Sequence, residues 1–221
     1  MQYKGWLTLF FADLLLELLA ITNDWYSIRF FTKPLLVAVL GVWFLFSSAK
    51  MGTLRNLIAM ALLLSWMGDV FLLMENQSDS YFLLGLGSFL IAHIVYILFF
   101  LSVRKKESIT KKWSVPLIIG IGSYSLLLFV LLLPHLASLK IPVAAYAITI
   151  SVMLIAATHA LIAGSARYWF IAGALLFVAS DSLLATTRFY HSFTGSDVLI
   201  MLTYGIAQFS LVNGAILYFR K

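Results

Sequence analysis

Residues 81–101 read YFLLGLGSFLIAHIVYILFFL, a run that contains no Asp, Glu, Lys or Arg. An α-helix rises about 1.5 Å per residue, so a run of this length crosses the roughly 30 Å hydrocarbon core of a bilayer. Uncharged apolar runs of this length are typical of transmembrane helices rather than of helices in soluble cores. The run therefore predicts that the chain spans a membrane.

The composition of the whole chain supports the same conclusion. Of the 221 residues, 62% are hydrophobic and 11% are charged, against roughly 25% charged in ordinary soluble domains. No polar stretch is long enough for a separate soluble domain, so we expect one domain over 1–221. Short polar breaks predict an all-α bundle of eight transmembrane helices, near 5–22, 34–49, 54–74, 81–101, 114–133, 141–163, 167–187 and 197–219.

Prolines and cysteines add further constraints. Pro34, Pro116 and Pro142 are expected in the first turns of the second, fifth and sixth helices, where a missing amide donor costs nothing. The absence of cysteine excludes disulfides, thiol nucleophiles and cysteine-ligated metals. The amino-terminal stretch is hydrophobic like a signal peptide, but Asp13 and Glu17 interrupt it and no small-x-small cleavage site follows, so we expect a retained helix.

Basic residues predict the orientation. One side of the expected topology carries Lys4, Lys50, Arg55, Arg104, Lys105, Lys106, Lys111, Lys112, Arg167, Arg220 and Lys221, and the other carries only Arg29, Lys33, Lys140 and Arg188. Because basic loops stay in the cytoplasm, both termini are expected there. Basic loops beside a membrane ordinarily contact anionic lipid head groups, so no nucleic-acid partner is expected.

Two aspartates lie inside apolar stretches of similar sequence, Gly68-Asp69-Val70-Phe71-Leu72 and Ser180-Asp181-Ser182-Leu183-Leu184. A carboxylate in a transmembrane helix costs several kcal/mol, so such residues usually mark functional sites. The separation of 112 residues also suggests two tandem four-helix halves, which an even number of helices makes parallel. We therefore expect Asp69 and Asp181 to face one shared cavity near the outer surface.

Other polar side chains are expected at a similar depth. Asp13 and Glu17 lie one turn apart on the first helix. The candidate substrate-binding residues around the aspartates are Lys33, His93, Tyr96, Arg188, Tyr204 and Gln208. They predict a pocket that opens toward the outer leaflet, with basic residues at its mouth. Structural roles remain open for each: the two cations could snorkel from helix ends or pair with Asp13 and Glu17, and His93 could be a hydrogen-bonded core residue.

Several kinds of catalytic site are absent from the sequence. It contains no H-E-x-x-H, G-x-S-x-G, Walker or glycine-rich dinucleotide pattern, and its four histidines have no zinc-site spacing. We therefore predict no metal and no cofactor, although a metal held by Glu17, Asp69 and Asp181 is an open alternative. Acid–base chemistry by carboxyl groups is what the sequence favours.

An ordered set of motifs resembles the YhhN family of multi-pass membrane proteins, which includes the lysoplasmalogenases. The motifs are Lys33-Pro34, Ser65-Trp66-Met67-Gly68-Asp69, Phe82…Gly85-Leu86…Phe89…Ala92-His93…Tyr96, Gly173-Ala174-Leu175-Leu176-Phe177…Ser180-Asp181…Leu184-Ala185…Arg188-Phe189 and Tyr204…Ala207-Gln208. The expected fifth and sixth helices carry little of the resemblance. It implies eight helices and hydrolysis of the vinyl ether bond of a lysoplasmalogen, with Asp69 and Asp181 as the catalytic pair. We expect the protein in a bacterial inner membrane.

Acid–base chemistry could accomplish this reaction with one protonated and one ionised carboxyl. The expected partners are a lysophospholipid substrate and membrane lipids, with no obligate protein partner. Two other functions remain open: a proton-coupled transporter, because aspartates at depth also serve proton relays, and a non-catalytic lipid-binding protein. Neither the native head group nor the aspartate that acts as the acid follows from the sequence.

Overall fold

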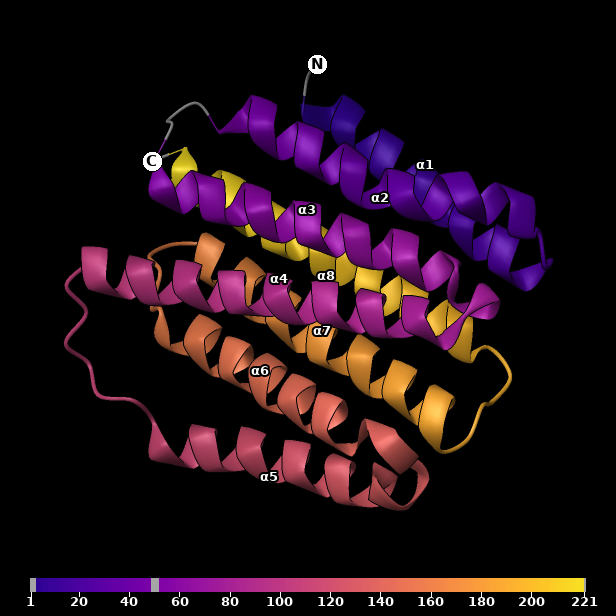
Figure 1. The fold of residues 1–221 in the computed structure, drawn as a ribbon. Coiled ribbons are helices and arrows are strands. Elements are labelled where there is room, and N and C mark those ends of the chain that lie inside the picture. Colours follow the sequence, from indigo (N-terminus) through magenta and orange to yellow (C-terminus); the bar gives the residue numbers. More distant parts are fainter. Residues whose placement is uncertain (1–2, 49–51, 221) are drawn as a thin grey trace.

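The computed structural model describes residues 3–48 and 52–220, which form eight long helices with short connections and no strands (Figure 1). The bounds are α1 (Tyr3–Thr22), α2 (Tyr26–Ser47), α3 (Thr53–Leu73), α4 (Asp79–Lys106), α5 (Val115–Leu132), α6 (Lys140–His159), α7 (Ala166–Phe189) and α8 (Ser196–Phe219). All eight are long and apolar enough to cross a membrane. The predicted all-α, multi-pass architecture is confirmed.

The second helix differs from the prediction. It begins at Tyr26 rather than at residue 34, so Pro34 lies inside α2 and not in its first turn. The predicted helix began after the charged residues Arg29 and Lys33. Arg29 nevertheless lies within α2, because it forms an ion pair with Glu17. Pro116, by contrast, occupies the first turn of α5, and Pro142 is the third residue of α6.

Both described ends of the chain lie at the same end of the bundle (Figure 1). We call this the terminal end, and the end with the α1–α2, α3–α4, α5–α6 and α7–α8 connections the opposite end. Most of the basic residues that were expected on one side lie at the terminal end, whereas Lys50 and Lys221 fall outside the described residues. Arg29, Lys33, Lys140 and Arg188 lie toward the opposite end.

Six helices pack into a closed ring. Neighbours in contact run in the order α2, α3, α4, α6, α7, α8 and back to α2. Helix α1 covers the ring at α2 and α8, and α5 lies against α6 and, less extensively, α7. Helix α8 is therefore the most buried span and α5 the least. In Figure 1, α5 lies at the edge of the bundle.

The helix bounds repeat along the chain. The helices α5 to α8 start between 112 and 117 residues after α1 to α4, respectively, and end between 110 and 116 residues after them. The contacts repeat as well: α3 with α4 corresponds to α7 with α8, and α4 with α6 corresponds to α8 with α2. This arrangement supports two parallel four-helix halves, and it places α3 and α7 across the ring from one another.

Glycines bring the site helices close to their neighbours. A Cβ atom built on Gly68, the residue before Asp69, would lie 2.6 Å from a ring carbon of Phe89 on α4. On α7, a Cβ at Gly173 would lie 3.0 Å from the carbonyl oxygen of Ala207 on α8. Small residues allow this approach, which in membrane bundles substitutes for the hydrophobic driving force of water.

Candidate active site

Asp69 lies about 6 Å from the end of α3 at the opposite end of the bundle, because the helix ends at Leu73, the fourth residue after it. Its side chain is buried, and its Oδ2 accepts a hydrogen bond of 2.6 Å from the Tyr204 hydroxyl of α8. The Nε2 of Gln208, one turn farther along α8, donates to the same hydroxyl at 3.2 Å. The polar groups from α3 and α8 therefore form one continuous hydrogen-bonded unit.

Asp181 is also hydrogen-bonded to a tyrosine. Its Oδ2 accepts a hydrogen bond of 2.6 Å from the Tyr146 hydroxyl of α6. The side chain is only half-buried, and its second carboxyl oxygen has no hydrogen-bond partner among the described residues. Asp181 is thus positioned by one neighbour and remains able to accept or donate a further hydrogen bond.

Aromatic rings connect the two carboxyl groups across the ring of helices. Phe177 of α7 packs edge to face against Tyr204 at 5.5 Å and against His93 of α4 at 4.7 Å between ring centroids. His93 in turn contacts the Tyr146 ring at 5.5 Å. The ring contacts therefore run from the tyrosine of Asp69 to the tyrosine of Asp181 through buried His93 and Phe177.

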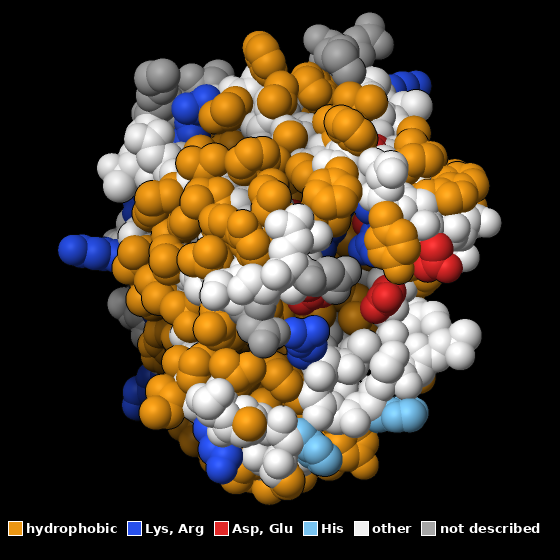
Figure 2. Space-filling model, turned by 45° about the vertical axis from the view of Figure 1, so that its right-hand side comes forward, with side chains coloured by type: hydrophobic (Ala, Val, Ile, Leu, Met, Phe, Trp, Pro, Cys, Tyr) orange, Lys and Arg blue, Asp and Glu red, His pale blue; other side chains and the backbone are white. Residues whose placement is uncertain are grey.

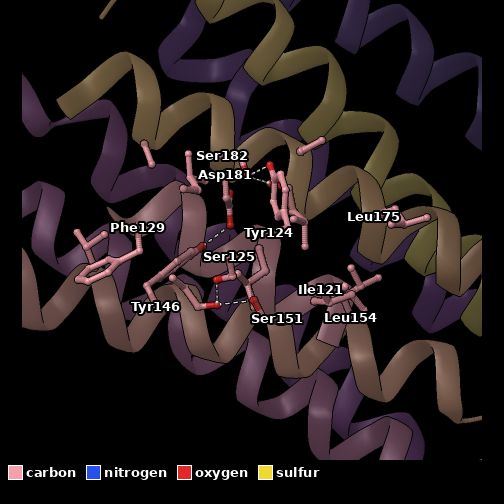
Figure 3. A pocket seen from close by; sticks show the side chains of 18 of the residues that line it. Ile121, Tyr124, Ser125, Phe129, Tyr146, Ser151, Leu154, Leu175, Asp181 and Ser182 are labelled. Carbon is pink, nitrogen blue, oxygen red and sulfur yellow. Dashed lines mark hydrogen bonds between the residues drawn. The ribbon is translucent and has the colours of Figure 1, made fainter. Parts of the chain in front are cut away.

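The prediction that Asp69 and Asp181 face one shared cavity is wrong, because only Asp181 lines the cavity that the structure shows. A cavity of about 460 Å³ is lined by Asp181 and Tyr146, and all of its lining residues belong to α5, α6 and α7 (Figure 3). Asp69 is instead enclosed against α8. The rings of His93, Phe177 and Tyr146 occupy the space between the two carboxyl groups, which explains why one open cavity does not reach both.

Two charged residues, Glu17 of α1 and Lys33 of α2, lie within electrostatic range of Asp69. Lys33 is half-buried and lies within electrostatic range of Asp69 and Glu17. Glu17 is fully buried and accepts hydrogen bonds from Arg29 Nε at 3.2 Å and from the Thr32 hydroxyl at 2.5 Å. The ion-pair partner of Glu17 is thus Arg29, rather than either of the two cations, Lys33 and Arg188, that the sequence analysis considered.

Charged side chains gather around a recess in the face shown in Figure 2. Hydrophobic side chains cover much of the rest of this face, as expected for a surface in contact with lipid. Arg188 is exposed, and its guanidinium lies 4.9 Å from the ring centroid of Phe82. This contact places the Arg188 guanidinium against α4.

Several buried polar atoms close to the carboxyl groups have no hydrogen-bond partner in the described part of the chain. They include Ser65 Oγ, both ring nitrogens of His93, Tyr96 Oη and Gln208 Oε1. Buried polar groups are normally paired, so atoms of this kind indicate places for water or substrate. Tyr96 and Gln208, both predicted from the sequence, are therefore available to orient a small polar species.

A metal ion held by Glu17, Asp69 and Asp181 would require these three carboxyl groups to lie together. Within residues 3–48 and 52–220, no group of three or more His, Cys, Asp and Glu side chains is arranged to hold a metal ion. Glu17 is engaged by Arg29 and Thr32, and Asp69 and Asp181 have separate tyrosine partners. The donor set named in the sequence analysis is therefore dispersed.

The partner of Asp181 was missed by the sequence analysis. Tyr146 lies on a helix that carries little of the family resemblance, and tyrosines in membrane proteins commonly belong to the interface. A signal was nevertheless available, because Tyr146 lies 112 residues after Pro34 and is thus at the repeat-equivalent position next to Lys33. Tyr124 of α5, which hydrogen-bonds to Ser182 at 2.9 Å, was missed for the same reason.

A family model, described as the YhhN family, matches residues 28–215. The chain belongs to the YhhN family. The match includes both aspartates, both of their tyrosine partners and Lys33, whereas Glu17 on α1 precedes it. No curated protein and no solved structure gives a significant match. The assignment of this chain to the YhhN family therefore rests on the family model, and its eight apolar helices agree with a multi-pass membrane protein.

Proposed function

We propose that this YhhN protein is a membrane hydrolase of the lysoplasmalogenase type, which cleaves the vinyl ether bond of a lysoplasmalogen. The observation that carries the proposal is the matched pair of transmembrane carboxyl groups, each with a tyrosine hydroxyl at 2.6 Å. Intramembrane carboxyl groups are costly and usually functional. Membership in the YhhN family supports the same class of reaction.

The chemistry suits a pair of carboxyl groups. A carboxylic acid transfers its proton to the alkene carbon remote from the ether oxygen, which leaves an oxocarbenium ion at the other carbon. An ionised carboxylate stabilises this cation, and water adds to it and returns a proton to a carboxylate. The resulting hemiacetal breaks its carbon–oxygen bond to give a fatty aldehyde and a glycerophospho-alcohol. The net reaction consumes one water molecule and no redox equivalent.

The remaining candidate residues have roles consistent with their positions. Tyr204 and Tyr146 hold the carboxyl groups in one orientation, and Gln208 extends the first of these pairs. Lys33 supplies positive charge near Asp69 and is suited to a phosphate group. In the proposed orientation, the termini are cytoplasmic and the carboxyl groups lie in the half of the membrane away from them.

The test is aldehyde release from a lysoplasmalogen by the purified protein. We expect Asp69→Asn and Asp181→Asn each to reduce turnover by at least about a thousandfold, because general acid–base and electrostatic contributions are of that size. Asp197→Asn is the matched control, since Asp197 is an exposed residue in the first turn of α8. Its turnover should remain close to that of the unmodified protein.

Substrate controls separate this reaction from other functions. Saturated ether and ester lysolipids have no alkene carbon to protonate, so neither should yield aldehyde. Near-normal aldehyde release by a folded Asp69→Asn or Asp181→Asn variant would rule out the proposed mechanism. Lipid movement across proteoliposomes without product would instead indicate transport.

A further inference from the structure

Helix α5 departs from the packing of its counterpart in the repeat. In the first half, α1 packs on α2 and on α8. In the repeat, α1 corresponds to α5, α2 to α6 and α8 to α4, so α5 would be expected to pack on α6 and α4. It packs on α6 and α7 instead. The displacement leaves α5 poorly covered and opens the cavity of about 460 Å³ along its inner side (Figure 3). This volume is within the roughly 300–1,000 Å³ of small-molecule pockets.

The cavity has one polar level within apolar walls. Tyr146 with Asp181 and Tyr124 with Ser182 are joined by hydrogen bonds of 2.6 and 2.9 Å, which hold these residues of α5, α6 and α7 together (Figure 3). Toward the terminal end, the lining is mostly apolar and includes Pro116, Leu117, Gly120, Ile121, Leu154 and Leu175. Ser151 also lines this section, but its hydroxyl donates to the Ala147 carbonyl of its own helix. This apolar section extends for about 12 Å along α5 from Tyr124 to Pro116.

The accessible carboxyl oxygen at the polar level identifies what the cavity can hold. The second oxygen of Asp181 has no partner among the described residues, and the side chain is half-buried at the cavity wall. On the other side of this level, toward the opposite end, the lining is apolar as well, but along α6 and α7 it reaches only to Val143 and Ala185. An occupant that fits the longer section therefore combines a polar or reactive group at this level with a long apolar part directed toward the terminal end. A single-chain lipid has this shape, and it reaches the cavity from the bilayer beside α5.

We propose that the cavity between α5, α6 and α7 binds the single alkyl chain of a lysolipid, with the chain directed toward the terminal end and its polar junction at Asp181. This inference rests on the proposed function for the reaction at that junction. It goes further in assigning Asp181 as the carboxyl group that meets the substrate. Asp69, enclosed against α8 by its hydrogen bond with Tyr204, does not line this cavity.

Photocrosslinking tests the placement of the chain without requiring turnover. The probe is a saturated hexadecyl ether lysophosphoethanolamine that carries a diazirine near the end of the chain, bound to the full-length protein in nanodiscs. Labelled residues should fall in the terminal-end parts of α5, α6 and α7, around Leu117, Leu154 and Leu175. Labelling mainly on α1, α2 or α3, or uniformly around the bundle, overturns the assignment.

Two glycines of α5 provide a matched pair of variants. Gly120 lines the cavity, whereas Gly122 does not, and neither has an atom within 4 Å of an added Cβ. Gly120→Leu should displace at least two methylene groups of the bound chain and weaken binding of the saturated probe by roughly tenfold. Gly122→Leu should bind the probe as the unmodified protein does.

A chain-length series sharpens the comparison. Octyl, dodecyl and hexadecyl forms of the saturated ether lysolipid should bind progressively more tightly to the unmodified protein, and Gly120→Leu should reduce this gain. Equal affinities for the two glycine variants across the series overturn the proposal.

The binding and catalytic results can fail independently. If the probe crosslinks to α5–α7 and binding depends on Gly120, but no lysoplasmalogen yields aldehyde, the chain site is supported and the proposed reaction is wrong. If aldehyde is released but Gly120→Leu and Gly122→Leu bind the probe equally, the reaction is supported and this chain site is wrong.

Discussion

The hydroxyl of Tyr204 donates a hydrogen bond of 2.6 Å to Oδ2 of Asp69, which lies 135 residues earlier in the chain. Both side chains are buried, so bulk water does not reach this hydrogen bond. Tyr204→Phe should therefore lower the turnover of a lysoplasmalogen by roughly tenfold to a hundredfold, since a hydrogen bond to a charged group contributes about 1.5–3 kcal/mol. Steady-state aldehyde release measures the loss, and circular dichroism checks that the helices persist.

The tyrosines at the cavity are expected to differ in importance. Tyr146 hydrogen-bonds to Asp181, whereas Tyr124 hydrogen-bonds to Ser182. Tyr146→Phe should reduce turnover by roughly tenfold or more, because it removes the group that orients the carboxylate. Tyr124→Phe serves as the matched change and should alter turnover by less than about threefold. Equal losses for the two variants would argue against a specific role for the Tyr146 hydroxyl.

The buried ion pair between α1 and α2 should contribute to stability. Glu17 is fully buried and accepts from Arg29 and Thr32. Glu17→Gln should destabilise the fold by about 1–3 kcal/mol, because partly exposed Arg29 loses its counter-charge. Thermal unfolding in detergent measures the change.

Asp24→Asn is the control for that substitution. Asp24 is exposed and has a φ of 56°, a conformation that asparagine adopts readily. Its melting temperature should be unchanged. If Glu17→Gln had the same melting temperature as Asp24→Asn, the ion pair would add nothing to stability.

Because α7 packs closely on α8, adding even a methyl group to Gly173 should lower the stability of the fold. A Cβ on Gly173 would lie 2.8 Å from Leu211 Cγ and 3.0 Å from the carbonyl oxygen of Ala207. Gly173→Ala should destabilise the protein by about 1–3 kcal/mol, as overpacked cores generally do. Gly87→Ala, where no atom lies within 4 Å of the new Cβ, should be neutral in the same thermal assay.

A cluster at the terminal end holds the α4–α5 connection. The Ser114 amide donates to His159 Nε2 at 2.8 Å, and the Trp113 ring stacks on the imidazole at 4.7 Å. Arg104 adds a hydrogen bond of 2.5 Å to the His159 carbonyl oxygen. His159→Leu should therefore increase trypsin cleavage after Lys111 and Lys112 by roughly fivefold, which corresponds to the loss of about one hydrogen bond.

His191→Leu provides the comparison for the cleavage assay, because His191 is an exposed residue in the α7–α8 connection. Its cleavage pattern should match that of the unmodified protein. Mass spectrometry of the fragments locates the cut sites. An unchanged rate for His159→Leu would show that the connection is held by other contacts.

Hydropathy and charge were sufficient to predict eight helices, most of their ends and the apolar setting of both aspartates. These features follow from the solvent, because a bilayer admits only long apolar helices with internally satisfied backbones. The start of α2 was wrong because the charge of Arg29 is neutralised by Glu17, a residue on another helix. Hydropathy calculated along one segment does not include a partner on another helix.

The partners of the aspartates, the ring of six helices and the cavity beside α5 depended on the tertiary structure. In water, an amphipathic pattern indicates which face of a helix is inside. In a bilayer, lipid-facing and protein-facing surfaces are both apolar, so the pattern leaves the rotation of each helix undetermined. Tyr146 and Tyr204 meet their carboxyl groups only because packing rotates α6 and α8 to present them.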